Sequence, residues 1–231
     1  MGNNLSDAVH PRIDSAVGAI PAAILARSGS VFYSGRSAFS GAAPLYLLGL
    51  NPGGSPQRQA SETVAADITQ WRTQPGDWSA YADESWEGAP PGTYKMQPRV
   101  LHMLRQLRLD PRRVPASNVV FVRSSSEAAL SAEKQSLLAA CWPVHAAVIQ
   151  ALGVRTLVCF GGTAGTWVRE RLGARALVES FSEANNRGWT SQAHRAPDGR
   201  VVVTVTHPSR VDWTNPKADP TPLVARMLAR A

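Results

Sequence analysis

Four short apolar segments constrain the fold of this chain more than any other feature. They are residues 44–50, 118–122, 156–160 and 201–206, and each ends at a glycine, asparagine, arginine or histidine. Runs of this length and composition are typical of strands that are buried on both faces, as in a parallel sheet. Segments with helical spacing alternate with them, at residues 16–25, 62–71, 99–107, 131–152, 161–172 and 222–231. The alternation predicts an α/β fold, a three-layer α/β/α sandwich around a mostly parallel four-stranded sheet.

The length of 231 residues fits one domain that spans residues 1–231. Apolar residues make up 44% of the chain, which is enough for a substantial core. We interpret residues 1–43 as an N-terminal extension, with loop structure over residues 28–40. Residues 73–98 are rich in glycine, proline and aromatic residues and are expected to form a long loop insertion.

The charge balance and the cysteines limit the partners and cofactors. There are 24 basic and 17 acidic residues, a net charge of +7, and such a surface attracts polyanions, including nucleic acid. Only Cys141 and Cys159 are present, so neither a thiolate zinc site nor a four-cysteine iron–sulfur cluster can form. The first residues lack the pattern of a signal peptide, and no apolar run is long enough to span a membrane. We expect a cytoplasmic bacterial protein with no metal, no cofactor and no membrane partner.

Polar residues follow the predicted strands. Parallel strands place their carboxyl ends at one edge of a sheet, so Asn51, Asn118 and His207 are expected to lie near one crevice. The glycine run at residues 161–165 has neither the lysine and spacing of a P-loop nor the G-x-G-x-x-G pattern. No G-x-S-x-G elbow is present, which disfavours a serine hydrolase.

The residues at these strand ends resemble motifs of the uracil-DNA glycosylase superfamily. The sequence GLNPGG at residues 49–54 resembles the first catalytic motif, in the Gly-x-Asn-Pro-Gly form of the single-strand-selective and mismatch-specific branches. His207, Pro208 and Ser209 resemble the second motif. Residues 117–120 resemble the strand that carries the base-reading asparagine, and residues 157–164 are similar to the third strand of the iron–sulfur branch without its cysteines. The resemblance covers residues 44–210 and implies a DNA glycosylase.

The resemblance also implies roles for the two catalytic candidates. The enzyme would flip a base out of DNA and cleave its N-glycosidic bond. His207 would donate a hydrogen bond to O2 of the departing pyrimidine. Asn51 would orient the attacking water without deprotonating it, because an amide is not a usable base. An enzyme with asparagine here is expected to be slower than a relative with aspartate.

The base would be bound by Asn118, Gly49, Leu50 and Gly53. Asn118 would donate to O4 and accept from N3–H of uracil, although a flipped amide would suit cytosine. The fastest uracil-specific branch has a tyrosine at the position of Gly53, which blocks the 5-methyl group of thymine. Glycine would leave this wall open unless another side chain, such as Trp78 or Trp86, fills the space.

Six further residues are candidates for DNA binding: Ser55, Arg123, Ser124, Ser209, Arg210 and Val211. Relatives insert a wedge residue after the His-Pro-Ser motif, but here Arg210 replaces the proline that usually follows it. The aromatic residue that stacks on the base is also missing, because its place falls near Val64. Either Trp71 or an aromatic residue of the 78–94 loop would replace it, or the pocket would be enlarged.

The leading hypothesis is a monofunctional DNA glycosylase that leaves an abasic site, since the motifs contain no lysine for lyase chemistry. Uracil is the default substrate. One alternative is an anti-phage glycosylase that removes hydroxymethylated or glucosylated cytosine, and another is a module that binds DNA lesions without cleaving them. A monomer is expected, because one pocket handles one flipped nucleotide.

Overall fold

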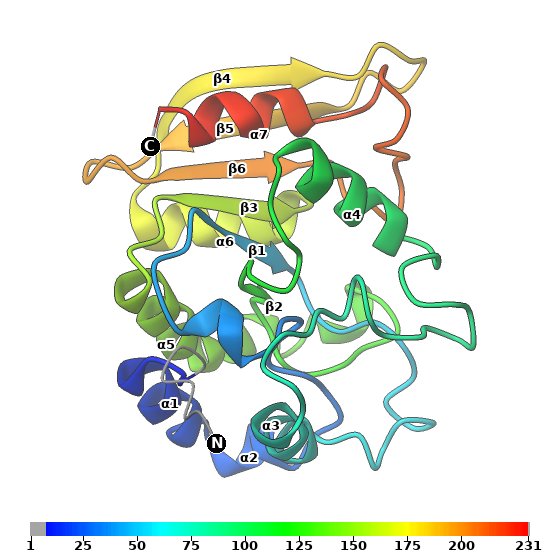
Figure 1. Ribbon diagram of the computed structural model, residues 1–231, viewed down its shortest axis with the longest axis vertical. Coiled ribbons are helices and arrows are strands. Elements are labelled where there is room, and N and C mark those ends of the chain that lie inside the picture. Colours follow the sequence, from blue (N-terminus) through cyan, green and yellow to red (C-terminus); the bar gives the residue numbers. More distant parts are fainter. Residues whose placement is uncertain (1–7, 231) are drawn as a thin grey trace, which may run out of the picture.

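The computed structural model describes residues 8–230 and is built around a six-stranded sheet in the order β2-β1-β3-β6-β5-β4 (Figure 1). The strands are β1 (Leu45–Gly49), β2 (Ala116–Asn118), β3 (Thr156–Phe160), β4 (Ala176–Ser182), β5 (Thr190–Arg195) and β6 (Val201–Val205). The strands β2, β1, β3 and β6 are parallel, whereas β5 and β4 continue the sheet in antiparallel orientation. The α/β class and the mostly parallel sheet are confirmed. The prediction of four strands is wrong.

The two additional strands have physical reasons for escaping the sequence pattern. The outer strand β4 is largely exposed, and its register shifts between Leu177 and Glu179. Its neighbour β5 has the sequence TSQAHR, which contains no apolar run. The edge strand is β4, and β5, which lies between β4 and β6, is only partly buried, so neither strand needs a continuous apolar run.

The predicted strand at residues 118–122 is also displaced. Pairing of β2 ends at Asn118, opposite Gly49, because β1 ends there. The next two amides then bond to the turn that follows β1, with Val119 N 2.9 Å from Gly49 O and Val120 N 2.9 Å from Leu50 O. Residues 119–122 are buried but lie outside the strand.

Helices cover both faces of the sheet. They are α1 (Pro11–Gly18), α2 (Ala22–Leu25), α3 (Val64–Thr73), α4 (Gln97–Gln106), α5 (Lys134–Ala151), α6 (Gly162–Leu172) and α7 (Thr221–Leu228), with short 3₁₀ helices at Arg36–Phe39 and Ala128–Leu130. One hydrophobic cluster joins α1, α3, α5 and α6 to one face, and a second joins α4 and α7 to the other. Alternate residues of β1 enter the two clusters, Tyr46 and Leu48 on one side and Leu45 and Leu47 on the other.

Two predicted helices differ in detail. The segment 16–25 is split between α1 and α2, since Pro21 caps a new helix. The long helix α5 begins at Lys134 with Glu133 as N-cap, because Ser131 ends a preceding 3₁₀ turn. Gly153, with a φ of 61°, follows its C-terminus as expected.

The N-terminal segment is part of the fold from residue 8 onward. Residues 28–34 run antiparallel to β2, with bridges from Gly29 to Val122 and from Phe32 to Ser117. The amide of Tyr33 donates to Ala116 O at 2.8 Å. This arrangement places Tyr33 beside β2, where its side chain interacts with Asn118.

The region between α3 and α4 contains neither helix nor strand. Its structure is fixed by Gln97, which is fully buried and donates through Nε2 to Ala80 O and Glu84 O, both at 2.8 Å. No helix among residues 8–230 is long and apolar enough to cross a membrane.

Candidate active site

The predicted site residues lie at the ends of β1, β2 and β6 or in the segments that follow them, and these parallel strands end on the same side of the sheet (Figure 1). The register sets Gly49 opposite Asn118 and Phe160 opposite Val205, so the turns after these strands start at the same level. A Cβ on Gly49 would lie 2.1 Å from Asn118 Oδ1, so only glycine leaves room for this amide. The site is therefore a consequence of parallel strand pairing.

Asn51 is held in one orientation by two acceptors. Its Nδ2 donates to Pro52 O at 2.7 Å and to Ser124 Oγ at 2.9 Å. The Ser124 hydroxyl in turn donates to Ser126 O at 2.8 Å, which leaves its lone pairs for Asn51. Both amide protons are used, and no residue in the described part of the chain donates to Asn51 Oδ1. The amide oxygen is thus free to accept a hydrogen bond from a water molecule.

His207 is held as a hydrogen-bond donor. Its Nδ1 accepts from Ser209 N at 3.1 Å and lies 2.8 Å from Ser209 Oγ. A backbone amide can only donate, so Nδ1 carries no proton and the neutral ring carries its proton on Nε2. Burial lowers the pKa of His207, and the nearby charge of Arg210 lowers it further. The ring lies beside Gly161, whose φ is 90° and whose Cβ would lie 3.5 Å from His207 Cδ2.

Asn118 is 8% exposed and lies beside an aromatic residue that the sequence analysis did not select, Tyr33. Burial raises the pKa of Tyr33 to about 12, and Arg123 and the Asn118 amide oppose this rise. The Tyr33 ring packs edge-on against Trp86 at 6.4 Å and in a tilted arrangement against Tyr81 at 5.9 Å. Tyr33 thus places an aromatic ring next to the Asn118 amide.

The other aromatic candidates are placed differently. Trp71 is 3% exposed and packs against Phe32 and Phe39 within the core, with Nε1 donating to Ser34 O. Val64 is fully buried in the same cluster. Neither residue can stack on a base in this conformation.

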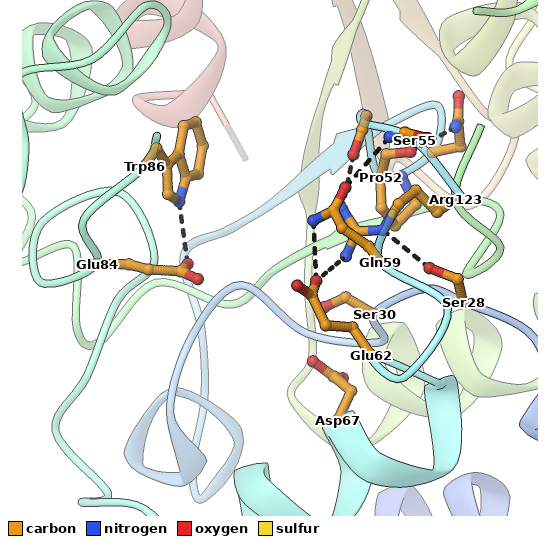
Figure 2. Close-up of polar contacts among 12 residues, drawn as sticks. Ser28, Ser30, Pro52, Ser55, Gln59, Glu62, Asp67, Glu84, Trp86 and Arg123 are labelled. Atoms are coloured by element: carbon orange, nitrogen blue, oxygen red, sulfur yellow. Dashed lines mark hydrogen bonds and ion pairs between the residues drawn. The ribbon is translucent and has the colours of Figure 1, made fainter. Parts of the chain in front are cut away.

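Carboxylates that the sequence analysis did not select surround Tyr33. Asp67 accepts from Val31 N at 2.8 Å, and burial raises its pKa to about 6. Glu84 accepts from Trp86 Nε1 at 3.0 Å, and burial raises its pKa as well. Figure 2 shows Glu84 and Trp86 on one side and Glu62, Asp67 and Arg123 on the other. Asp67 fixes the segment that carries Tyr33, which makes it a positioning residue.

Arg123, a predicted contact to DNA, forms hydrogen bonds to the first motif and to two neighbouring side chains. Its Nη1 donates to Gly53 O at 2.6 Å, its Nη2 to Glu62 Oε2 at 2.9 Å and its Nε to Ser28 Oγ at 3.1 Å (Figure 2). The side chain is only 12% exposed. All three nitrogens are committed within the protein.

Two further predicted DNA contacts, Ser124 and Val211, have buried side chains. Ser124 is 5% exposed, and its hydroxyl connects Asn51 to Ser126 O. Val211 is fully buried and belongs to the hydrophobic cluster under α4 and α7, so its side chain cannot act as a wedge.

Three predicted contact residues remain accessible. Ser55 is half-buried, and its hydroxyl accepts from Arg58 N at 3.3 Å in a tight turn. Ser209 is exposed beside His207. Arg210 is exposed, and its guanidinium makes no hydrogen bond or ion pair within residues 8–230.

The wall next to the first motif is open. Leu50 is half-buried, whereas Gly53 is exposed and no atom lies within 4 Å of a Cβ built on it. Neither Trp78 nor Trp86 fills this space.

No protein-family model matches the chain, and no curated protein matches it. The interpretation of the site accordingly depends on the geometry of Asn51, Asn118 and His207. In Asn51 and His207, hydrogen bonds to neighbouring residues determine which polar atom of the side chain stays free: Oδ1 in Asn51 and Nε2 in His207.

Proposed function

We propose that this protein is a monofunctional DNA glycosylase of the uracil-DNA glycosylase superfamily. The proposal rests on two groups at one edge of the sheet. Asn51 Oδ1 is a free acceptor, and His207 Nε2–H is a fixed donor. Hydrolysis of an N-glycosidic bond needs both: a group that orients water and a group that stabilises the departing base. The helices on both faces of the sheet agree with the three-layer α/β/α arrangement of the proposal.

The reaction begins when a nucleotide leaves the DNA stack and its base enters the site. The bond between C1′ of the sugar and N1 of the pyrimidine breaks, and the electron pair moves onto the base. His207 Nε2–H donates to O2, where negative charge develops, and removal of such a donor typically slows a reaction by roughly 10²–10³. Asn118 binds the base edge with its amide.

Water completes the reaction at the sugar. Asn51 Oδ1 accepts a hydrogen bond from the water that forms the new bond to C1′. The amide does not take the proton, which passes to the departing base or to solvent. A neutral amide gives the cationic sugar little electrostatic stabilisation, so a modest rate is expected.

The substrate proposal starts from uracil. A second candidate is a pyrimidine with a bulky 5-substituent, such as the hydroxymethylated or glucosylated cytosine of phage DNA. The empty space beside Gly53 favours this candidate, because nothing there would collide with such a group. We further propose that the protein acts as a monomer in the cytoplasm.

The test is excision from end-labelled oligonucleotides, single- and double-stranded, followed by hot alkali. The panel contains uracil, mismatched thymine, 5-hydroxymethyluracil and phage DNA with native or glucosylated hydroxymethylcytosine. Asn51→Ala and His207→Ala should abolish or strongly reduce cleavage, while the exposed-site variant Ser125→Ala should not. Absence of cleavage on every substrate, with DNA still bound, would refute the catalytic proposal and favour a module that only binds lesions.

A further inference from the structure

The β4–β5 hairpin and the loop before α7 form a second surface at the edge that carries His207. We propose that this surface binds single-stranded DNA next to the flipped nucleotide, with a phosphate between Arg187 and Lys217 and an unpaired base on Trp189. The choice of DNA as ligand rests on the proposed function. The position of this surface is fixed by contacts of the β4–β5 hairpin, which do not depend on the proposed function.

The direction of the strands places the hairpin at this edge. The strand β5 is antiparallel to both β6 and β4, so the turn at residues 183–189 lies where β6 ends (Figure 1). Two hydrogen bonds attach the hairpin to the segment after His207. Arg187 Nη1 donates to Arg210 O at 3.0 Å, and Ala184 N donates to Lys217 O at 2.7 Å. The hairpin therefore has a defined position relative to the catalytic histidine.

Between these two segments lies a hollow of about 450 Å³. It is lined by Ala184, Asn185, Asn186, Arg187, Asn215 and Lys217. Arginine, lysine and asparagine side chains and backbone amides are the groups that bind phosphates of nucleic acids. The hollow contains two exposed cations and no exposed carboxylate in its lining.

One buried carboxylate supports the lining from within the hairpin. Glu183 is 4% exposed, and its Oε2 accepts from Asn185 Nδ2 at 2.7 Å and lies 3.8 Å from Arg187 Nη2. Two other acids lie in the loop. Asp212 is exposed, and its carboxylate is bonded by Thr214 and lies 3.7 Å from Arg99. The carboxylate of Asp219 accepts from Thr221 N at 2.9 Å and lies 3.0 Å from His102 Nε2. The two cations of the hollow therefore exceed the one carboxylate that contacts them, and a net positive charge faces solvent.

Trp189 supplies an aromatic surface beside the hollow. It is 38% exposed, and Leu177, at the opposite end of the hairpin, is the other strongly exposed large apolar residue between residues 8 and 230. The Arg187 guanidinium lies 4.9 Å from the centre of the Trp189 ring. Aromatic rings combined with arginine are a common platform on which bases of single strands stack.

The test measures binding by the full-length chain with Asn51→Ala, so that no cleavage occurs. A labelled single-stranded oligonucleotide and its duplex are titrated by fluorescence anisotropy over a series of salt concentrations. Lys217→Ala and Arg187→Ala should each weaken binding and reduce the slope of log K against log salt by about 0.7, the value for one phosphate of a single strand. Trp189→Leu should weaken single-strand binding roughly ten- to a hundredfold, with the slope unchanged and with Trp189→Phe close to the parent.

Arg175→Ala is the matched control, because Arg175 is exposed at the opposite end of β4. It should leave both affinity and salt slope unchanged. Unaltered binding in the Lys217, Arg187 and Trp189→Leu variants would overturn this inference, even if the protein excises uracil. An equal loss of duplex and single-strand binding in Trp189→Leu would overturn the stacking on an unpaired base. If the protein excises no base but these variants lose binding as expected, the glycosylase proposal fails and the surface remains a site for single-stranded DNA.

Discussion

Replacement of Ser124 by alanine tests whether this residue orients Asn51 or contacts DNA. The hydroxyl accepts one of the two hydrogen bonds that Asn51 Nδ2 donates, and its loss leaves Pro52 O as the remaining acceptor. The amide then has more freedom, and its oxygen points at the attacking water for a smaller part of the time. We expect a slower chemical step with little change in DNA affinity.

The size of the effect follows from the bond that is lost. A typical intramolecular hydrogen bond contributes about 0.5–1.5 kcal/mol. If the whole contribution is lost in the transition state, the rate falls by a factor of about 2–12, since about 1.4 kcal/mol corresponds to tenfold. The variant should also be less stable by about 0.5–1.5 kcal/mol, because it loses the hydrogen bond from Ser124 to Ser126 O.

The assay is single-turnover excision of the preferred base, with enzyme in excess, alongside equilibrium binding to the same oligonucleotide. Ser125→Ala is the control, since Ser125 is the adjacent exposed serine. A phosphate contact would give the opposite pattern, with weaker binding, a smaller salt slope and an unchanged rate of chemistry. That pattern, or an unchanged excision rate, would refute the role that we assign to Ser124.

Three further predictions concern the site and the core. Gly49→Ala should strongly reduce excision while the fold is retained, because the new Cβ would lie 2.1 Å from the base-reading amide; normal activity on the full substrate panel would contradict this. Arg210→Ala should raise the pKa of His207, since the arginine charge disfavours the protonated ring, and an unchanged NMR titration of the imidazole would count against it. Burial lowers the pKa of His145 to about 3, so the folded state should lose stability as the pH falls from 6.5 toward 3, by up to about 1.4 kcal/mol per pH unit. Asp67, with its pKa raised to about 6, should offset part of this loss between pH 6 and 3.8, and urea unfolding of His145→Gln should show a flatter acid limb than the parent.

The parallel part of the sheet could be predicted from the sequence because its strands are buried on both faces. Residues 156–160 illustrate this: five consecutive buried residues form β3 with the bounds that the apolar run predicts. The strands β4 and β5 could not be predicted in this way, because both are only partly buried and neither contains a continuous apolar run. The end of β2 depends on where its partner β1 stops, which no local pattern encodes.

The residues of the site also differ in whether a local sequence pattern identifies them. Asn51, Asn118 and His207 could be selected because each belongs to a motif in or directly after a predicted strand. Tyr33 could not, since it reaches the site through pairing of residues 28–34 with β2, far away in the sequence. The sequence predicts a DNA contact for Ser124. Its hydrogen bond with Asn51 could not be predicted, because Asn51 lies in a different turn, far away in the sequence.

Both outer margins of the sheet are shielded from self-association. Open strand edges tend to pair with other chains, and proteins block them with covering segments, charges and bulges. Residues 28–34 cover the outer side of β2. On the opposite margin, β4 is interrupted by an irregularity between Leu177 and Glu179, and Glu179 is held by ion pairs with Arg226 and Arg230. A shortened protein that began at β1 would lose the first of these two barriers, and its freed β2 edge would be open to intermolecular strand pairing.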